Sequence, residues 1–136
     1  MAQAEALCGS RLTAMRRRVL EILLESHVAL GAYDVLGRLR SEGHAAQPPV
    51  AYRALDFLVS QGLAHRIERL NAFVACHRPA ECEAPAFLIC RACNRVAETG
   101  AVPKRGALAQ DAQALGFAIE ATVVEAQGLC PGCRDA

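Results

Sequence analysis

The sequence of 136 residues contains no tryptophan, and aromatic residues make up only 4% of it. A hydrophobic core must therefore be built mainly from Ala, Leu and Val, within a hydrophobic content of 53%. No apolar run approaches the roughly 18 residues of a membrane-spanning helix, and the N-terminus lacks the apolar segment of a secretory signal. We therefore expect a cytoplasmic protein with no membrane partner.

Lysine is also scarce, since fourteen of the fifteen basic residues are arginine. The net charge of +1 hides an asymmetry: residues 1–78 carry ten arginines and seven acidic residues, whereas residues 79–136 carry five basic and seven acidic residues. The forked guanidinium of arginine suits contacts to phosphate and guanine. A solvated surface would explain this charge equally well, so charge alone is a weak indication of nucleic-acid binding.

The seven cysteines are an odd number, which makes complete internal pairing impossible. Four of them form two C-x-x-C knuckles, Cys90–Cys93 and Cys130–Cys133, a spacing that turns two thiolates toward one ion. Clustered cysteines in a reducing compartment are metal ligands more often than disulfide partners. We predict a closed, tetrahedral, structural Zn²⁺ site, with two disulfides within the knuckles or a rubredoxin-like iron site as the alternatives.

The N-terminal part, residues 1–78, predicts three helices followed by a β-hairpin. Helices are expected over residues 15–26, 32–41 and 50–61, and strands over 64–69 and 72–76. This order is that of a winged helix-turn-helix, whose third helix enters the DNA major groove, although many three-helix bundles share it. Arg16, Arg17 and Arg18 crowd the start of the first helix, where cations are unfavourable. An external anion or simple solvation would explain them.

The C-terminal part, residues 86–136, predicts a small α/β domain beyond a polar linker at residues 79–85. We expect strands at 87–90, 96–99 and 117–125, and a helix at 104–115 with Leu108 and Leu115 facing inward. A sheet this small has an edge to cover, and pairing with a second copy would cover it. The fold class is therefore α+β, a winged helix-turn-helix domain followed by a small α/β dimerisation domain.

A second group of metal-ligating residue types surrounds the predicted domain junction. A mixed nitrogen, sulfur and oxygen set drawn from two domains is what a metal-dependent hinge requires, and thiolates favour Zn²⁺. Each residue alone also has an ordinary explanation as a surface histidine, a solvated glutamate or a small apolar cysteine. The spacing leaves both interpretations open for His65, Cys76, His77, Cys82, Glu83 and Glu98.

Several short motifs occur together in one order along the chain: Leu12–Arg16, Ala32-Tyr-Asp, Pro48–Leu58, Cys76-His77 and the two knuckles. This combination resembles the ferric uptake regulator superfamily, and most closely its zinc-sensing branch, over roughly residues 10–133. The resemblance implies a homodimeric, zinc-dependent transcriptional repressor. Such a protein binds double-stranded operator DNA when zinc fills a regulatory site, controls zinc-uptake genes, and has no enzymatic activity or small-molecule substrate.

The resemblance also implies roles for individual residues, including one structural and one regulatory Zn²⁺ per chain. It matches Cys90, Cys93, Cys130 and Cys133 to the structural zinc ligands. It matches His65, Cys76 and Glu98 to three regulatory ligands. The DNA contacts that we expect are Tyr33, Tyr52, Arg53 and Arg16.

The fourth regulatory ligand departs from the family pattern, because the linker lacks the histidine that the zinc-sensing branch commonly places there. Cys82 or Glu83 must supply the ligand instead. We expect Cys82, because a thiolate is the better zinc ligand, and keep Glu83 as the alternative. The recognition helix also begins Val50-Ala51 in place of the usual Thr-Val, which removes one hydroxyl contact to phosphate.

Two other functions compete with a zinc-responsive repressor. The same scaffold could sense iron, manganese or peroxide, but the thiols of Cys76 and Cys82 and the absence of histidine-rich segments argue against this. A thiol or iron–sulfur redox enzyme would need a reactive knuckle cysteine and a cleft with a general base. That function would leave the arginine-rich N-terminal part without a role.

Overall fold

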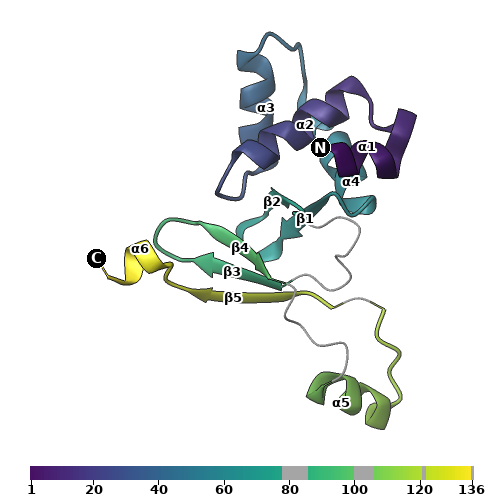
Figure 1. Ribbon diagram of the computed structural model, residues 1–136, viewed down its shortest axis with the longest axis vertical. Helices are drawn as coiled ribbons and strands as arrows, with labels where there is room; N and C mark the ends of the chain where they lie inside the picture. The colour runs from purple at the N-terminus through teal and green to yellow at the C-terminus, as the bar shows by residue number, and fades with distance from the viewer. Residues whose placement is uncertain (78–85, 100–105, 121, 136) are drawn as a thin grey trace.

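The computed structural model describes residues 1–77, 86–99, 106–120 and 122–135. Helices α1–α4 form one end of the molecule, a β-hairpin and a three-stranded sheet lie beyond them, and α5 lies at the far end (Figure 1). Helices and strands are both present in the expected order, so the predicted α+β fold class is confirmed. Within the described ranges, no helix has the length and apolar character needed to cross a bilayer.

The N-terminal helices begin at residues whose local chemistry favours a helix start. Helix α1 spans Ala2–Cys8, and a 3₁₀ turn follows at Gly9–Arg11. Helix α2 spans Ala14–Glu25, and its N-cap Thr13 accepts a hydrogen bond from the backbone N–H of Arg16 at 3.3 Å. Helix α3 spans Ala32–Ser41, and the Asp34 carboxylate accepts from the Gly31 N–H at 2.9 Å. Helices α2 and α3 match the predicted ones to within a few residues, whereas α1 was not predicted.

Helix α4 spans Pro48–Ser60 and begins on the two prolines, whose missing N–H groups would be unpaired in a first turn anyway. It ends at a left-handed Gly62, with the Gly62 N–H donating to the Val59 carbonyl and the Leu63 N–H to the Leu58 carbonyl. One face of the helix is buried and consists of Ala51, Ala54, Leu55 and Leu58. The opposite face is left for contacts outside the domain.

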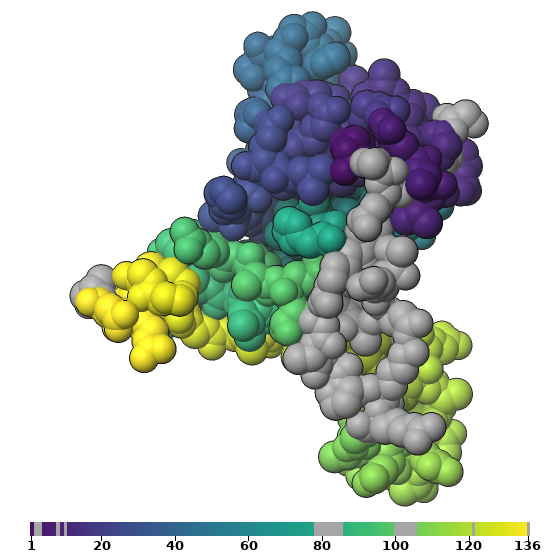
Figure 2. Space-filling view, viewed as in Figure 1, coloured from purple at the N-terminus to yellow at the C-terminus, as the bar shows by residue number. Residues whose placement is uncertain are grey.

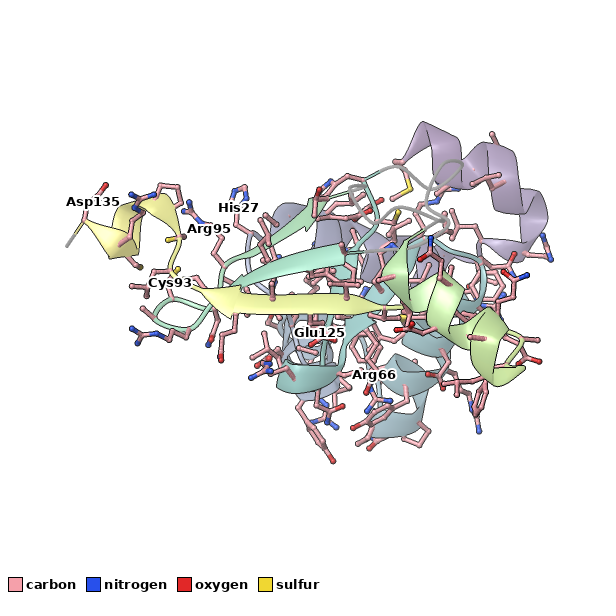
Figure 3. All side chains as sticks on the ribbon, turned by 90° about the horizontal axis from the view of Figure 1, so that it is seen from below. His27, Arg66, Cys93, Arg95, Glu125 and Asp135 are labelled. Carbon is pink, nitrogen blue, oxygen red and sulfur yellow. The ribbon has the colours of Figure 1, made fainter. Side chains whose placement is uncertain are left out.

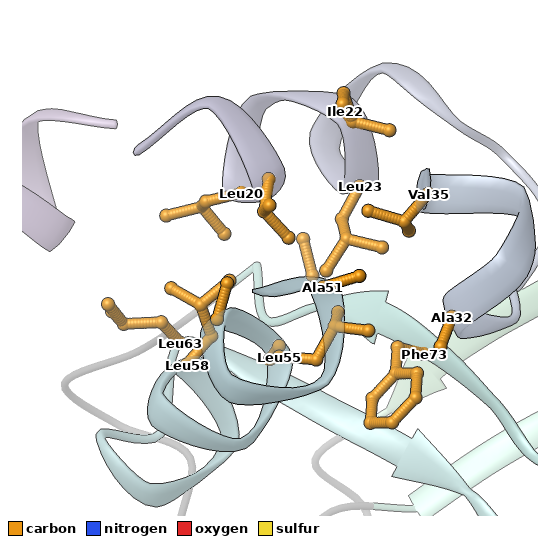
Figure 4. Close-up of a cluster of buried hydrophobic side chains, with 14 of the residues drawn as sticks. Leu20, Ile22, Leu23, Ala32, Val35, Ala51, Leu55, Leu58, Leu63 and Phe73 are labelled. Atoms are coloured by element: carbon orange, nitrogen blue, oxygen red, sulfur yellow. The ribbon is translucent and has the colours of Figure 1, made fainter. Parts of the chain in front are cut away.

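The main core lies between α2, α3, α4 and the hairpin (Figure 4). Aliphatic side chains fill it almost entirely, and Phe73 is the only aromatic residue among its fully buried members. Small residues such as Ala51 and Ala54 let α4 approach its neighbours closely. This composition agrees with the expectation of an Ala, Leu and Val core, and burying each leucine contributes about 1.5–3 kcal/mol.

The hairpin, or wing, consists of strands β1 (Ala64–Ile67) and β2 (Ala72–Ala75) in antiparallel register. The first strand is shorter than predicted because residues Glu68–Leu70 form the 3₁₀ turn η2. Asn71 closes the turn in the left-handed conformation, with φ of 46°, and its side-chain oxygen accepts from Arg66 at 2.7 Å. The wing tip is therefore a compact turn with defined backbone N–H groups.

The three-stranded sheet has the order β4-β3-β5. Strand β3 (Ala86–Cys90) pairs antiparallel with β4 (Val96–Thr99) and parallel with β5 (Val124–Gly128). Helix α5 (Ala107–Leu115) lies between β4 and β5 in the chain. The short helix α6 (Pro131–Arg134) follows β5. The predicted linker at residues 79–85 lies outside the described residues, and the domain boundaries stay a prediction.

Two predictions for this part are wrong. The last strand begins at Val124, and residues 117–120 have no regular structure, although a strand was expected from residue 117. Leu108 and Leu115 of α5 are 61% and 74% exposed instead of facing inward. Helix α5 projects away from the body of the molecule (Figure 2). The apolar residues of α5 and of the segment after it are therefore not buried within one chain.

The wing and the sheet share a second, smaller core. Ile67 of the wing packs with Phe87 and Ile89 of β3 in this cluster. A backbone bridge between Val28, after α2, and Arg95, before β4, adds a second connection. The N-terminal helices are therefore attached to the sheet through the wing and through the segment after α2.

Candidate metal centres and nucleic-acid interface

The two knuckles come together at one end of the sheet. The Sγ atoms of Cys90, Cys93, Cys130 and Cys133 all lie within 4.8 Å of one another. The Sγ atoms of Cys93 and Cys130, one from each knuckle, are 3.8 Å apart. All four are free thiols, so neither knuckle holds a disulfide.

The ends of β3 and β5 place these cysteines. Cys90 is the last residue of β3, and Asn94, with φ of 62°, closes the turn that carries Cys93. The Arg91 N–H donates to the Gly128 carbonyl at 2.9 Å, which joins this turn to the end of β5. Cys130 then precedes α6, whose first residue is Pro131. The two knuckles therefore lie together where β3 and β5 end.

The thiols of this cluster differ in acidity. Backbone N–H groups of Cys130 and Cys93 lower the pKa of the Cys90 thiol to about 6, and the backbone N–H of Cys133 lowers the pKa of Cys130. Hydrogen bonding to the other three sulfurs raises the pKa of Cys133 to about 12. Four clustered thiolates need a cation, and a soft tetrahedral sulfur set fits Zn²⁺ or iron.

A second cluster joins the wing to the sheet. His65 of β1, Cys76 after β2 and Glu98 of β4 present ligand atoms within 4.8 Å of one another. The Cys76 Sγ is 3.6 Å from Glu98 Oε1, and His65 Nε2 is 3.9 Å from the same oxygen. Cys76 is buried, and the other two side chains are mostly covered. The structure therefore brings together three of the residues expected at this junction, from β1, from the end of β2 and from β4.

Burial lowers the pKa of His65, against the opposing influence of the Glu98 carboxylate. The neutral imidazole is the form that binds a metal. The His65 ring also lies 5.4 Å from the Phe87 ring, which limits its orientation. Three donors of nitrogen, sulfur and oxygen type fit Zn²⁺ and leave one tetrahedral position for a further ligand.

The two residues expected to supply that ligand, Cys82 and Glu83, lie outside the described residues. His77, which follows Cys76, is exposed, and its backbone N–H donates to Glu98 Oε2 at 3.4 Å. Its side chain lines a cavity of about 380 Å³ beside Glu98, His27 and Arg95. His77 therefore borders the cluster without belonging to it.

Three of the four expected DNA contacts lie on exposed parts of α3 and α4. Tyr33 is 69% exposed and Tyr52 is 43% exposed, and Arg53 is also exposed. Arg16, on α2, is half-buried: its guanidinium lies 3.8 Å above the centre of the Phe57 ring and donates to the Arg11 carbonyl at 2.6 Å. Two tyrosines and one forked guanidinium are therefore exposed on α3 and α4.

The other two arginines of the crowded helix start have partners inside the domain. Arg17 forms an ion pair with Glu5. Arg18 contacts Glu42 at 2.6 Å, Glu21 at 3.0 Å and Glu25 at 3.2 Å. An external anion is therefore not needed to explain them, and no local pattern in the sequence indicates that Glu42, in the loop after α3, is the main partner of Arg18.

Glu125 is a further residue that sequence reasoning missed. Its carboxylate accepts hydrogen bonds from the backbone N–H groups of Glu68 and Arg69 at 2.8 and 3.1 Å. The strand expected at residues 117–125 ends at Glu125, and this residue received no role from the sequence. A contact between residues more than fifty positions apart leaves no local signal.

A winged helix-turn-helix whose wing shares a nitrogen, sulfur and oxygen cluster with a second, sheet-containing unit defines the class of metal-responsive regulators. Residues 8–126 match the model of the ferric uptake regulator family, and the chain belongs to this family. The zinc uptake regulation protein of Escherichia coli (strain K12) is 40% identical over 139 residues, covering 98% of this chain and 80% of that protein.

Two solved relatives have the same arrangement of elements. A zinc uptake regulator complexed with zinc and DNA superposes with a TM-score of 0.91 at 39% identity, covering 98% of this chain and 92% of that chain. The holo crystal structure of XcZur superposes with a TM-score of 0.85 at 38% identity, covering 99% of this chain and 96% of that chain. The apo structure of XcZur superposes with a TM-score of only 0.52 at 37% identity, covering 98% of this chain and 92% of that chain. This chain is therefore arranged as in the holo form.

Proposed function

We propose that the protein is a zinc-responsive transcriptional repressor that binds operator DNA as a homodimer and controls zinc-uptake genes. One observation carries the proposal: His65 and Cys76 of the wing meet Glu98 of the sheet in a single cluster. A metal held there joins the DNA-binding unit to the rest of the chain. The likeness to zinc uptake regulators supports zinc as that metal and DNA as the partner.

Each chain would hold two zinc ions with different roles. The four knuckle cysteines bind a structural ion that closes the sheet end, and their thiol protons leave as it binds. His65, Cys76, Glu98 and a linker residue bind the regulatory ion, with Cys82 preferred over Glu83. At both positions zinc would only cross-link its ligands. Four protein ligands leave no open coordination position for a substrate.

The regulatory cluster acts by linkage. A ligand that binds one arrangement of two units more tightly than others stabilises that arrangement by its differential affinity. Glu98 holds the metal on the sheet side, and the two wing residues hold it on the DNA-binding side. The orientation of α4 relative to the dimer is thereby fixed, and α4 is the helix that enters the major groove.

The exposed apolar side chains beyond the sheet support the homodimer. Leu108 and Leu115 of α5 lie mostly in solvent, and so does Phe117 at 73% exposure. A large contiguous apolar surface on one chain indicates a protein contact. A second copy covers this surface and the edge of the sheet. The dimer works in the cytoplasm, where its DNA partner lies.

The test measures DNA binding at controlled free zinc. A duplex selected from a randomised library by the wild-type protein is titrated with and without zinc, and with His65→Ala. The variant should lose the zinc response and keep the knuckle zinc. His27→Ala, an exposed histidine lining the neighbouring cavity, is the matched control. Zinc-independent DNA binding would contradict the proposal, and a stronger response to iron or manganese would replace zinc as the sensed metal.

A further inference from the structure

The tip of the wing is held by a carboxylate of the sheet. Glu125 Oε2 accepts from the Glu68 N–H at 2.8 Å, and Glu125 Oε1 accepts from the Arg69 N–H at 3.1 Å. Two residues along the same strand, Gln127 Oε1 accepts from the Arg69 guanidinium at 3.1 Å. Figure 3 shows Glu125 projecting from β5. These contacts link residues that are far apart in the sequence.

The strand register places Glu125 in line with the regulatory cluster. Phe87 on the central strand pairs with Glu98 on one side and with Glu125 on the other. Residues directly opposite on paired strands share a face of the sheet. Two carboxylates therefore flank Phe87 on the face against which Ile67 of the wing is buried. Glu98 contacts His65 and Cys76 at the strands of the wing, and Glu125 contacts Glu68 and Arg69 at its tip.

Only a carboxylate can make this contact fully. The two N–H groups begin the η2 turn, where a helical turn supplies no internal acceptor for them. A carboxylate offers one oxygen to each, and such charge-assisted bonds are among the strongest in proteins. A glutamine would offer one oxygen and turn an amide N–H toward the other donor. The side chain at position 125 is therefore chemically specific.

Among the residues that the structure describes, Glu125 belongs to neither group of potential metal ligands. The two groups of ligand atoms found among the described residues contain the four knuckle cysteines and the set of His65, Cys76 and Glu98. The hydrogen bonds that Glu125 and Gln127 accept from the wing tip involve no metal.

We propose that Glu125 is a positioning residue that seats the wing on the sheet and thereby preassembles the regulatory zinc site; this inference rests on the proposed function. With the tip seated, His65 and Cys76 already lie opposite Glu98. The apparent affinity for a ligand falls in proportion to the fraction of molecules in the competent arrangement. Removing the attachment therefore raises the zinc concentration required, without removing any ligand.

The experiment uses the full-length dimer with Glu125→Gln and Glu125→Ala, and with Glu120→Gln as the matched control. Glu120 is exposed and lies on the segment leading to the same strand, so its substitution removes the same charge away from the wing. Zinc affinity at the regulatory site is measured against a competing dye chelator, and amide hydrogen exchange is followed at Glu68 and Arg69. We expect roughly tenfold weaker zinc binding in Glu125→Ala, a smaller loss in Glu125→Gln, and faster exchange at both amides.

Unchanged zinc affinity or unchanged protection of the two amides in Glu125→Ala would overturn the inference. If Glu125→Ala does not fold, the volume-conserving Glu125→Gln variant decides by the same two readouts. Both measurements work without DNA, so they are distinct from the test of the proposed function. Failure of the wild-type protein to bind DNA in the presence of zinc would refute the proposed repressor function. The role of Glu125 would still be judged by zinc affinity and amide exchange.

Discussion

Arg53 lies on the exposed face of α4, opposite the buried Ala51, Leu55 and Leu58. A guanidinium in the major groove can contact guanine O6 and N7 together, which is worth about 1–3 kcal/mol of discrimination. We expect Arg53→Ala to weaken binding to the selected operator by this amount and to leave binding to random duplex nearly unchanged. Fluorescence anisotropy with both duplexes measures the two affinities.

An equal loss on both duplexes would instead make Arg53 a phosphate contact. Arg134→Ala, on the exposed α6 next to the knuckles, is the matched control and should bind both duplexes as the wild type does.

The choice between Cys82 and Glu83 is also made at the scale of one residue. If Cys82 completes the regulatory site, Cys82→Ser should raise the zinc concentration needed for DNA binding roughly tenfold or more, because a neutral hydroxyl replaces a thiolate. Glu83→Ala should then change little. Zinc titrations of DNA binding by both variants, with metal analysis of the knuckle zinc, measure this.

The opposite pattern, with Glu83 critical and Cys82 silent, would reverse the assignment without affecting the repressor function. No effect of either substitution would mean that the linker supplies no ligand.

At the scale of elements, Arg18 joins α2 to the loop after α3. Its hydrogen bonds lower the pKa of Glu42 and of Glu25 below the usual value of 4.5. Because the folded state then binds protons less readily than the unfolded state, this stabilisation is complete above pH 4.5 and is lost as the pH falls through the folded pKa values. The midpoint of urea unfolding should therefore differ between wild type and Arg18→Gln at pH 7, and the difference should shrink below pH 4.5.

Arg66→Gln, on the wing, is the control for the loss of one charge and should not show this convergence. A difference between wild type and Arg18→Gln that stays constant from pH 7 to pH 3 would contradict the assignment of the pKa shifts to Arg18.

The two knuckles close a unit that contains β4, α5 and β5. Because metal binding to such a site is coupled to folding, Cys93→Ser should release the structural zinc and unfold this unit, with loss of the dimer. Circular dichroism, zinc content and sedimentation measure the three consequences. Ser60→Ala, on the exposed end of α4, serves as a control for handling and should remain a zinc-loaded dimer. A folded, dimeric Cys93→Ser would rule out the structural role.

Local signals in the sequence predicted the elements that depend on neighbouring residues. Prolines 48 and 49 mark the start of α4, Gly62 marks its end, and the C-x-x-C spacing marks both knuckles. Signals of this kind could not place Glu125 on the wing tip or Glu42 on Arg18, because these contacts join distant segments. The prediction of a strand around Phe117 was wrong for another reason. The alternating apolar residues there are not buried within one chain.

At the scale of the whole molecule, α5 and the segment after it need a partner. Leu115→Asp places a charge on the exposed apolar surface that we assign to the second copy, where an unpaired buried charge is strongly unfavourable. We expect the dimer to dissociate at micromolar concentration while the helical end of the chain stays folded. Analytical ultracentrifugation with circular dichroism measures both.

Gln110→Asp, on an exposed position of the same helix, is the matched control for an added charge. A Leu115→Asp protein that remains dimeric would place the interface elsewhere.

The absence of tryptophan has an optical consequence for this molecule. The chain has two tyrosines, Tyr33 and Tyr52, and both are exposed on the helical end, away from either cysteine cluster. Emission excited near 280 nm therefore originates only from α3 and α4. The protein carries an intrinsic fluorescent reporter of whatever approaches these two helices, and no label is needed to observe that approach.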